Sequence, residues 1–220
     1  MGTDWTWLGP EIIDSIKETL YMVSVSFLFA VLIGIPLGVI LVITRENGIL
    51  PNRIIFSILN IVINIFRSIP FIILIVAIIP FTRLIVGTAI GTTAAIVPLV
   101  IFTAPYIGRL VENSLLEVDQ GVIELAQAMG ATTWQIIWKF LLPEALGSII
   151  LALTIAFIGL VGASAMAGAV GAGGLGDLAI TYGYQQFKPL VMLITVVLLV
   201  VFVQLIQSLG NILAKKIRRH

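Results

Sequence analysis

The sequence predicts an all-α integral membrane protein with five transmembrane helices. Of its 220 residues, 60% are hydrophobic and only 10% are charged, whereas a soluble domain typically carries about 25% charged residues. A helix needs about 20 mostly apolar residues to cross a bilayer. Five stretches meet this requirement, and we take residues 1–220 as a single transmembrane domain. The predicted spans are residues 20–43, 54–80, 92–110, 146–166 and 190–213.

The distribution of basic residues predicts the topology of these spans. Five is an odd number, so the two termini lie on opposite sides of the membrane. Lys and Arg are enriched in cytoplasmic loops. If the C-terminus is cytoplasmic, the basic residues on that side are Arg45, Arg53, Arg109, Lys139, Lys215, Lys216, Arg218 and Arg219. The other side then holds only Lys17, Arg83 and Lys188. We therefore expect the N-terminus outside, and the segment between the third and fourth spans inside the cell.

Several kinds of chemistry are excluded by composition. The chain has no Cys, which removes disulfides, thiolate metal sites and cysteine nucleophiles. Its one His is His220, so histidine-based catalysis or metal binding is not expected. The net charge of +1 offers no strongly basic surface for nucleic acid. No GxxxxGK[ST] sequence occurs, so the chain is not expected to hydrolyse ATP itself, and we predict no enzyme activity, metal or cofactor in this chain.

Glycine and proline interrupt the predicted spans. The breaks are GIPLG at 34–38, RSIPF at 67–71, and Pro98 and Pro105 in the third span. Such breaks are tolerated when neighbouring groups satisfy the freed backbone. They are either ordinary kinks or bent segments that help to form a path between helices.

Small residues also recur at four-residue spacing in two spans, which lets helices approach closely. The pairs are Gly34 with Gly38, Gly159 with Ala163, and Ala163 with Ala167. The spacing fits a contact within one chain and a contact between two copies equally well.

Two groups of polar or flexible side chains are candidates for a translocation path. Arg67 is the one basic residue expected deep in a span, with Asn64 and Ser68 nearby, whereas the acidic residues are expected in loops. Because intramembrane charge is costly, Arg67 either lines a polar cavity or bonds to carbonyls freed by Pro70. Met166, next to Ser164 and other small residues, is either a flexible gate or a packing methionine.

Residues 119–143 predict two short helices joined by a glycine turn. Asp119 is a plausible N-cap, and Gly130 stands where a helix C-terminus favours a left-handed residue. Thr132 or Thr133 can cap the second helix, which Pro143 ends or kinks. The first helix has an apolar stripe made of Val122, Ile123, Leu125, Ala126 and Met129. The segment either lies on the headgroups with Trp134 and Trp138 as anchors or docks into a cytoplasmic partner.

This segment carries a family resemblance. Glu124-Leu125-Ala126, Gly130 and then Leu142-Pro143 resemble the EAA…G…LP loop of ABC-importer permeases, with Leu125 in place of the commoner Ala and Phe140 in place of the usual Ile. The segments INIFRSIPFIILI (63–75), RLVENSLLEV (109–118) and AMAGAVGAGGLGDLAITYGY (165–184) are similar to the permeases of methionine-type importers.

The resemblance implies a type I ABC-importer permease fold with five spans and the N-terminus outside. It implies a homodimer of permease chains in the bacterial cell membrane, two ABC ATPase chains that bind ATP and Mg, and a substrate-binding lipoprotein. The implied substrate is D- or L-methionine or its derivatives. A permease for another amino acid or an osmoprotectant, an ion channel, and a membrane enzyme remain as rivals. The residues that the resemblance assigns to ATPase coupling are Glu124, Leu125, Ala126, Met129, Gly130, Ala131 and Pro143.

The sequence GAGGLG at 171–176 matches a dinucleotide-binding pattern by chance. A true fingerprint follows a strand and has an acidic residue about 20 positions later, and neither condition is met. We expect either a flexible outer loop, which in the related permeases borders the outward gate, or a plain glycine turn.

Overall fold

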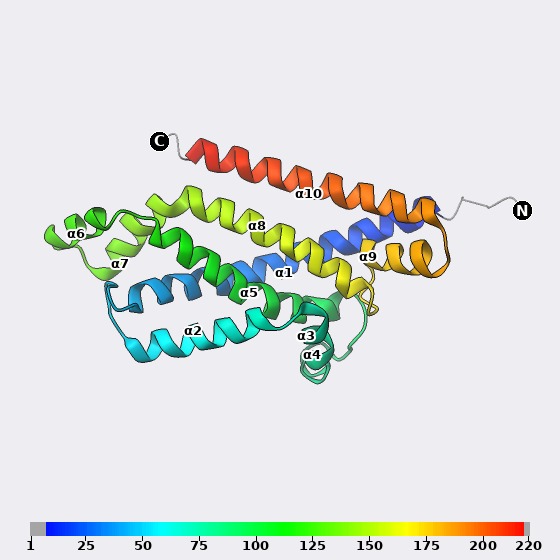
Figure 1. Cartoon of the computed structure of the whole chain (residues 1–220), viewed down its shortest axis with the longest axis horizontal. Coiled ribbons are helices and arrows are strands. Elements are labelled where there is room, and N and C mark those ends of the chain that lie inside the picture. The colour runs from blue at the N-terminus through cyan, green and yellow to red at the C-terminus, as the bar shows by residue number, and fades with distance from the viewer. Residues whose placement is uncertain (1–7, 218–220) are drawn as a thin grey trace, which may run out of the picture. The chain divides into compact units, whose positions relative to one another are not determined.

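The computed structural model describes residues 8–217, and within this part of the chain all regular structure is helical (Figure 1). Arg218 and Arg219, which entered the topology prediction, lie outside the described residues, as does His220. Four described helices are long and apolar enough to cross a bilayer. They are α1 (Leu8–Thr44), α5 (Thr92–Leu116), the continuous helix Thr133–Gly168 and α10 (Pro189–Ile217).

The predicted second span is a bent pair of helices. It consists of α2 (Arg53–Ser68) and α3 (Phe71–Ala77), which meet at 102° and give a fifth crossing only if they are counted together. Pro70 stands at the bend with extended backbone angles. Proline lacks a backbone donor and disfavours helix at the residue before it, which accounts for the break. The short helix α4 (Ile79–Val86) follows directly.

The GIPLG sequence does not interrupt the first span, because α1 continues through Pro36. The two glycines serve close packing instead. A Cβ atom on Gly34 would lie 2.6 Å from Ile107 of α5, and one on Gly38 would lie 2.7 Å from Val111. This pair of small residues is therefore an internal helix contact. The helix α5 likewise continues through Pro98 and Pro105 and extends past the predicted end at Leu110.

Pro143 does not end the second helix of the 119–143 segment, as the sequence suggested it could. The helix α7 (Thr133–Ile136) runs through a π-helical turn, η1 (Ile137–Leu141), into α8 (Leu142–Gly168). The ring of an internal proline meets the carbonyl four residues earlier. For Pro143 that residue is Lys139, which lies in the π turn, and such turns occur as local bulges inside longer helices.

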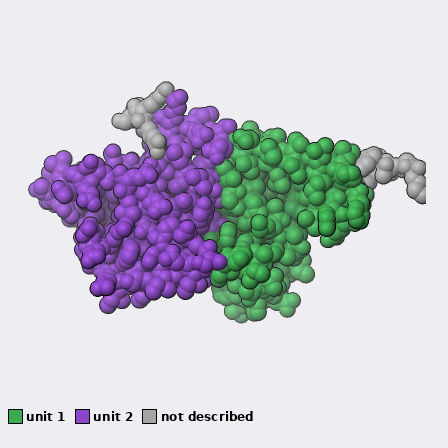
Figure 2. Space-filling view, in the orientation of Figure 1, with its two compact units in different colours: residues 1–28, 69–102, 157–206 green, residues 29–68, 103–156, 207–220 purple. Residues whose placement is uncertain are grey.

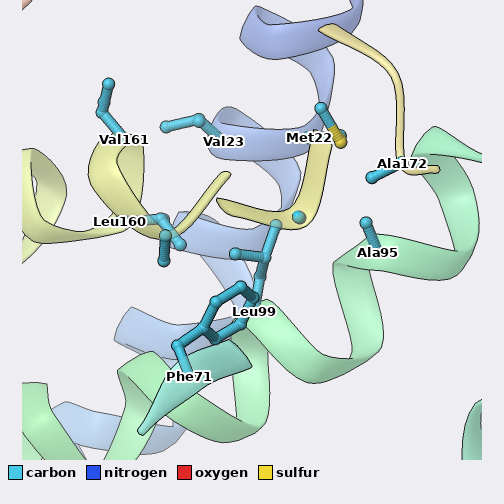
Figure 3. Close-up of a cluster of buried hydrophobic side chains, with 10 residues drawn as sticks. Met22, Val23, Phe71, Ala95, Leu99, Leu160, Val161 and Ala172 are labelled. Atoms are coloured by element: carbon cyan, nitrogen blue, oxygen red, sulfur yellow. The ribbon is translucent and has the colours of Figure 1, made fainter. Parts of the chain in front are cut away.

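The contacts of the chain fall into two compact units (Figure 2). Unit 1 comprises residues 1–28, 69–102 and 157–206, and unit 2 comprises residues 29–68, 103–156 and 207–220. Figure 3 shows the apolar core of unit 1, where Met22, Leu99 and Leu160 are almost fully buried. Phe71 packs edge-on against Phe102, with ring centroids 5.2 Å apart. Ala163 and Ala167 belong to the same core, so their spacing also reflects internal packing.

Candidate functional site

The segment at residues 119–141, which we call the first corner, is built from consecutive capping motifs. The Asp119 carboxylate accepts a hydrogen bond of 2.6 Å from the Gly121 amide and caps α6 (Gln120–Ala128). At the other end of α6, Gly130 has φ +76°, its amide donates to the Gln127 carbonyl, and the Ala131 amide donates to the Ala126 carbonyl. This pair of bonds is a Schellman motif, in which glycine is the favoured left-handed residue.

A capping box then starts the next helix. The Gln135 amide donates to the Thr132 hydroxyl at 3.3 Å, and the Thr132 amide donates to the Gln135 side-chain oxygen at 2.9 Å. The sequence named Thr132 and Thr133 as alternatives, and the structure selects Thr132. Because both ends of the glycine turn are capped, the direction of the chain is fixed on each side of Gly130.

The predicted apolar stripe of α6 splits into two faces. Ala126 is fully buried and Val122 and Ile123 are half-buried, so this face packs against the rest of the protein. Leu125 and Met129, one helical turn apart, are instead 60% and 63% exposed. Trp134 and Trp138 add two more exposed side chains, which contact each other with ring centroids 5.3 Å apart. The first corner thus presents four large exposed apolar side chains, which we call the corner surface.

A pocket of about 470 Å³ lies on another face of the first corner, within unit 2. Its polar lining includes Arg45, which follows α1, and Glu124 and Gln127 from α6. No hydrogen bond or ion pair of the Glu124 side chain is formed within residues 8–217. The carboxylate therefore stays available to a group outside this chain.

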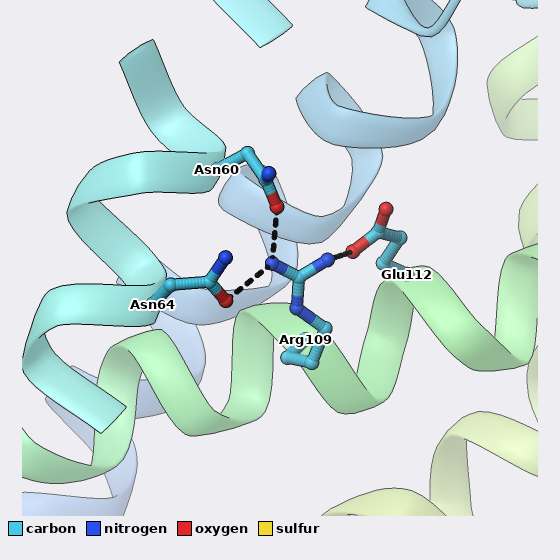
Figure 4. A network of polar contacts seen from close by, with 4 residues as sticks. All are labelled: Asn60, Asn64, Arg109 and Glu112. Carbon is cyan, nitrogen blue, oxygen red and sulfur yellow. Dashed lines mark hydrogen bonds and ion pairs between the residues drawn. The ribbon is translucent and has the colours of Figure 1, made fainter. Parts of the chain in front are cut away.

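A cluster of four polar side chains joins α2 to α5 within unit 2 (Figure 4). One guanidinium nitrogen of Arg109 donates to the Glu112 carboxylate at 2.5 Å, and another donates to the side-chain oxygens of Asn60 at 2.5 Å and Asn64 at 3.0 Å. Glu112 is only 3% exposed. A buried charge is costly unless it is paired and hydrogen-bonded. Here Arg109 pairs with Glu112 of its own helix and is hydrogen-bonded to two asparagines of α2.

This cluster corrects one expectation from the sequence. The acidic residues are not all in loops, because the buried Glu112 lies within α5. Asn64 bonds to Arg109. The Arg67 side chain is exposed and makes no hydrogen bond in the described chain, so the expected bonds to carbonyls near Pro70 are absent there.

The remaining predicted pathway residues differ in their surroundings. The Ser68 hydroxyl donates to the Asn64 carbonyl of its own helix at 2.7 Å. Ser164 is buried and donates to the Val161 carbonyl at 2.8 Å, so its hydroxyl is satisfied within α8. Met166 is 53% exposed on the same helix. Of the two residues near the end of α8, only Met166 therefore presents its side chain outward.

Residues 171–188, which we call the second corner, are held in place and do not form an open loop. Gly173 and Gly174 have φ +83° and +78° and lead into α9 (Gly174–Leu178). The Gly174 amide donates to the Glu18 carboxylate at 2.7 Å, and the Leu175 amide donates to the Thr19 hydroxyl at 2.8 Å. A π-helical segment, η2 (Ala179–Gln185), then leads to α10. The sequence offered a flexible loop or a plain glycine turn for GAGGLG, and the structure has a glycine turn that leads into a short helix fastened to α1.

Comparison with known proteins places these features in a family. Residues 34–219 match the family described as the binding-protein-dependent transport system inner membrane component. The chain belongs to this family. It is therefore a multi-pass protein of the inner membrane. The chain is 54% identical over 214 residues to a Vibrio cholerae protein named as the probable D-methionine transport system permease protein MetI, covering 97% of this chain and 95% of that one.

Solved structures of ABC transporters share the fold of this chain. One, described as showing inward facing conformations of the MetNI methionine ABC transporter, matches with a TM-score of 0.94 and 50% identity over 99% of both chains. Another, an amino acid ABC transporter with histidines, matches with a TM-score of 0.77 and 21% identity over 98% of this chain and all of that chain. The all-helical type I importer permease fold is thus shared by transporters whose sequences have diverged widely.

Sequence reasoning missed two parts of this arrangement. The first is the Arg109 cluster. Asn60 and Asn64 lie one turn apart on an apolar helix, and this spacing could have indicated a polar partner on a neighbouring helix. The second is the pair of hydrogen bonds that amides of the second corner donate to Glu18 and Thr19. Their partners lie 156 residues away, and no local pattern links them.

Proposed function

We propose that this chain is the membrane-spanning permease subunit of an ATP-driven importer of methionine. The observation that carries the proposal is the 54% identity, over nearly the whole chain, to a protein named as a D-methionine permease. The fold match to a chain of a methionine ABC transporter, with a TM-score of 0.94, supports it over the same extent.

In this proposal the chain works as a homodimer with two copies of a cytoplasmic ABC ATPase and an extracytoplasmic substrate-binding lipoprotein. ATP and Mg bind to the ATPase subunits, and this chain itself hydrolyses nothing. The N-terminus is outside and the C-terminus is cytoplasmic, in keeping with the basic residues Lys215 and Lys216 in the last turn of α10. The first corner then faces the ATPase.

The first corner is the element that couples the two subunits. Leu125 and Met129 lie on one face of a short amphipathic helix, and such a face binds in an apolar groove of a partner. Gly130 and Ala131 fix the turn, Ala126 packs inward, and Glu124 is free to pair with the ATPase. ATP binding shifts the helices between inward-open and outward-open arrangements only because the assembly binds ATP more tightly in one of them.

The translocation path is proposed to run past Met166, whose exposed thioether closes it until the helices move. We also propose that Ser164, Asn64, Arg67 and Ser68 lie near this path. Replacing Met166 by Ala is expected to increase methionine leak through reconstituted vesicles in the absence of ATP. An unchanged leak removes Met166 from this role.

The decisive experiment is reconstitution with the ATPase and binding protein in proteoliposomes. We expect methionine-dependent ATP hydrolysis and ATP-dependent uptake of labelled methionine. Competition by a panel of amino acids and osmoprotectants identifies the substrate, since the true substrate competes at the lowest concentration. Uptake by the purified chain without any ATPase subunit would contradict the proposal and favour a channel or an autonomous carrier.

A further inference from the structure

Phe187, in the second corner, has a backbone conformation that its side chain disfavours. Its φ of +53° makes it the one non-glycine residue with positive φ among residues 8–217. The left-handed conformation brings the Cβ of an L-residue close to the following carbonyl oxygen, and for a bulky residue it is a genuine outlier. Such strain persists only where the surrounding structure imposes it.

The strain arises from the way in which η2 ends. The Gln186 amide donates to the Thr181 carbonyl, the Phe187 amide donates to the Tyr184 carbonyl, and the Lys188 amide donates to the Tyr182 carbonyl. Phe187 therefore follows the C-cap, Gln186, at the position where a helix end usually carries glycine. Glycine would make the same bonds without strain, so the end of the helix does not explain the phenylalanine.

Burial does not explain this residue either. The Phe187 side chain is 87% exposed, and the neighbouring Tyr184 is 68% exposed. Burying a phenylalanine contributes substantially to folding stability, but no other part of the described chain buries Phe187, so it makes no such contribution. Both local reasons to place Phe at this position are thus absent.

The tip that carries Phe187 is also held firmly in place. A Cβ atom on Gly183 would lie 3.0 Å from the Met192 side chain, so η2 packs closely against the start of α10. The Lys188 ammonium lies 5.4 Å from the centroid of the Tyr182 ring. Pro189 begins α10 immediately afterwards. An aromatic side chain on a preorganised support loses little conformational freedom on binding.

We propose that Phe187, assisted by Tyr184, is the anchor by which the extracytoplasmic substrate-binding protein docks onto this chain. The inference rests on the proposed function, which places the second corner outside the cell and supplies the partner. Exposed aromatic residues surrounded by polar ones are typical of protein interfaces. Here Gln185 and Gln186, both exposed, form the polar surroundings. Insertion into lipid would favour an apolar neighbourhood and would not require a fixed, strained backbone.

The test measures binding of the cognate binding protein, without its lipid, to the permease–ATPase complex in nanodiscs. We expect Phe187→Gly to weaken binding at least tenfold and, because it relieves the strain, to leave the melting temperature equal or higher. Phe187→Tyr, which keeps an aromatic ring, is expected to bind within twofold of the unmodified complex. Wild-type affinity in Phe187→Gly would overturn the inference.

A matched control separates the anchor from a general loss of apolar surface. Leu84, which is 83% exposed in α4, belongs to the same unit as Phe187. We expect Leu84→Ser to keep wild-type affinity, and an equal loss in both variants would overturn the inference. A lipid contact would instead lower the melting temperature of Phe187→Gly in nanodiscs and leave binding intact, which also overturns it. If the unmodified complex binds no binding protein, the proposed function itself fails.

Discussion

The two corners of this molecule use the same local elements in opposite ways. Each combines a short helix, a left-handed glycine and a π-helical turn that leads into a long helix, α8 in the first corner and α10 in the second. Around Gly130 of the first corner there is no atom within 4 Å of the position where a Cβ would lie. In the second corner a Cβ on Gly176 would lie 2.2 Å from the Ala165 carbonyl oxygen.

This difference separates two reasons for glycine. The first corner needs it only for a backbone angle, and the corner surface around it remains free for a partner. The second corner needs glycine for the backbone angle at Gly173 and Gly174, and at Gly176 it also needs glycine because two backbones touch. Hydrogen bonds that its amides donate to Glu18 and Thr19 hold the result in place. Local sequence produces similar turns in both cases, and packing decides whether the turn leaves an exposed apolar surface or becomes a rigid support.

The largest effect is expected from Gly176→Ala in the second corner. The added methyl would overlap the backbone of Ala165, which cannot move aside as a flexible side chain can. Overpacking a core typically costs about 1–3 kcal/mol, and a backbone clash costs more, so we expect little folded protein. The measurement is the yield of monodisperse protein after detergent extraction.

The matched control for this variant is Gly162→Ala in α8. No atom lies within 4 Å of the position where its Cβ would be, and alanine is favoured over glycine inside a helix by about 1 kcal/mol. We expect wild-type yield or better. Equal losses in the two variants would show that close packing is not what distinguishes the second corner.

The next largest effect concerns unit 2, which contains the first corner and the Arg109 cluster. Glu112→Leu leaves the Arg109 guanidinium partly buried without its carboxylate. Removing one partner of a buried ion pair costs about 3–5 kcal/mol. We expect a clear fall in melting temperature, measured on the purified complex.

The double variant Arg109→Met with Glu112→Leu removes both charges and should recover most of that loss. Replacing a buried pair by apolar residues is often close to neutral. If the double variant is as unstable as the single one, the cost comes from lost packing and not from an unpaired charge.

A third, smaller effect tests whether Gly130 matters for its backbone angle or for contact with the partner. Valine is strained in the left-handed conformation, which costs about 1–2 kcal/mol for a residue with a Cβ, although space is available for it. We expect Gly130→Val to displace the first corner and abolish uptake while the protein still inserts into the membrane. Gly130→Asn, which tolerates positive φ, should retain most uptake, and similar loss in both would point to contact with the partner instead of backbone angle.

The sequence predicted those parts of the fold that depend on neighbours along the chain. Asp119 as a cap, Gly130 as a left-handed turn and the apolar spans all follow from local patterns, and the structure contains them. The break near Pro70 was also readable, because proline acts on the residues beside it. The same reasoning overestimated the helix-breaking effect of Pro36 and Pro143, because long helices packed against neighbours tolerate a proline inside them.

The candidate site was predictable to a lesser extent. The first corner could be located from its motif, but the division of its stripe into a buried face at Ala126 and an exposed face at Leu125 depends on which helices pack behind it. Arg109 and Glu112 were placed near a loop because their charge suggested a span end. Inside α5 the two charges pair with each other, and side-chain amides of another helix bond to Arg109, which lowers the cost of burying them. Pairings between distant segments leave no periodic signal.

The smallest effect is expected from Thr19→Val, which tests the fastening of the second corner to α1. The variant keeps the shape of the side chain but leaves the buried Leu175 amide without its acceptor. The loss of a typical hydrogen bond costs about 1 kcal/mol, so the melting temperature should fall slightly. Thr195→Val is the matched control, because the Thr195 hydroxyl donates to the Val191 carbonyl of its own helix and its removal orphans no amide. Both threonines are buried, so a fall confined to Thr19→Val isolates the bond between the segments. Equal falls would mean that the Thr19 hydrogen bond contributes nothing specific to holding the second corner.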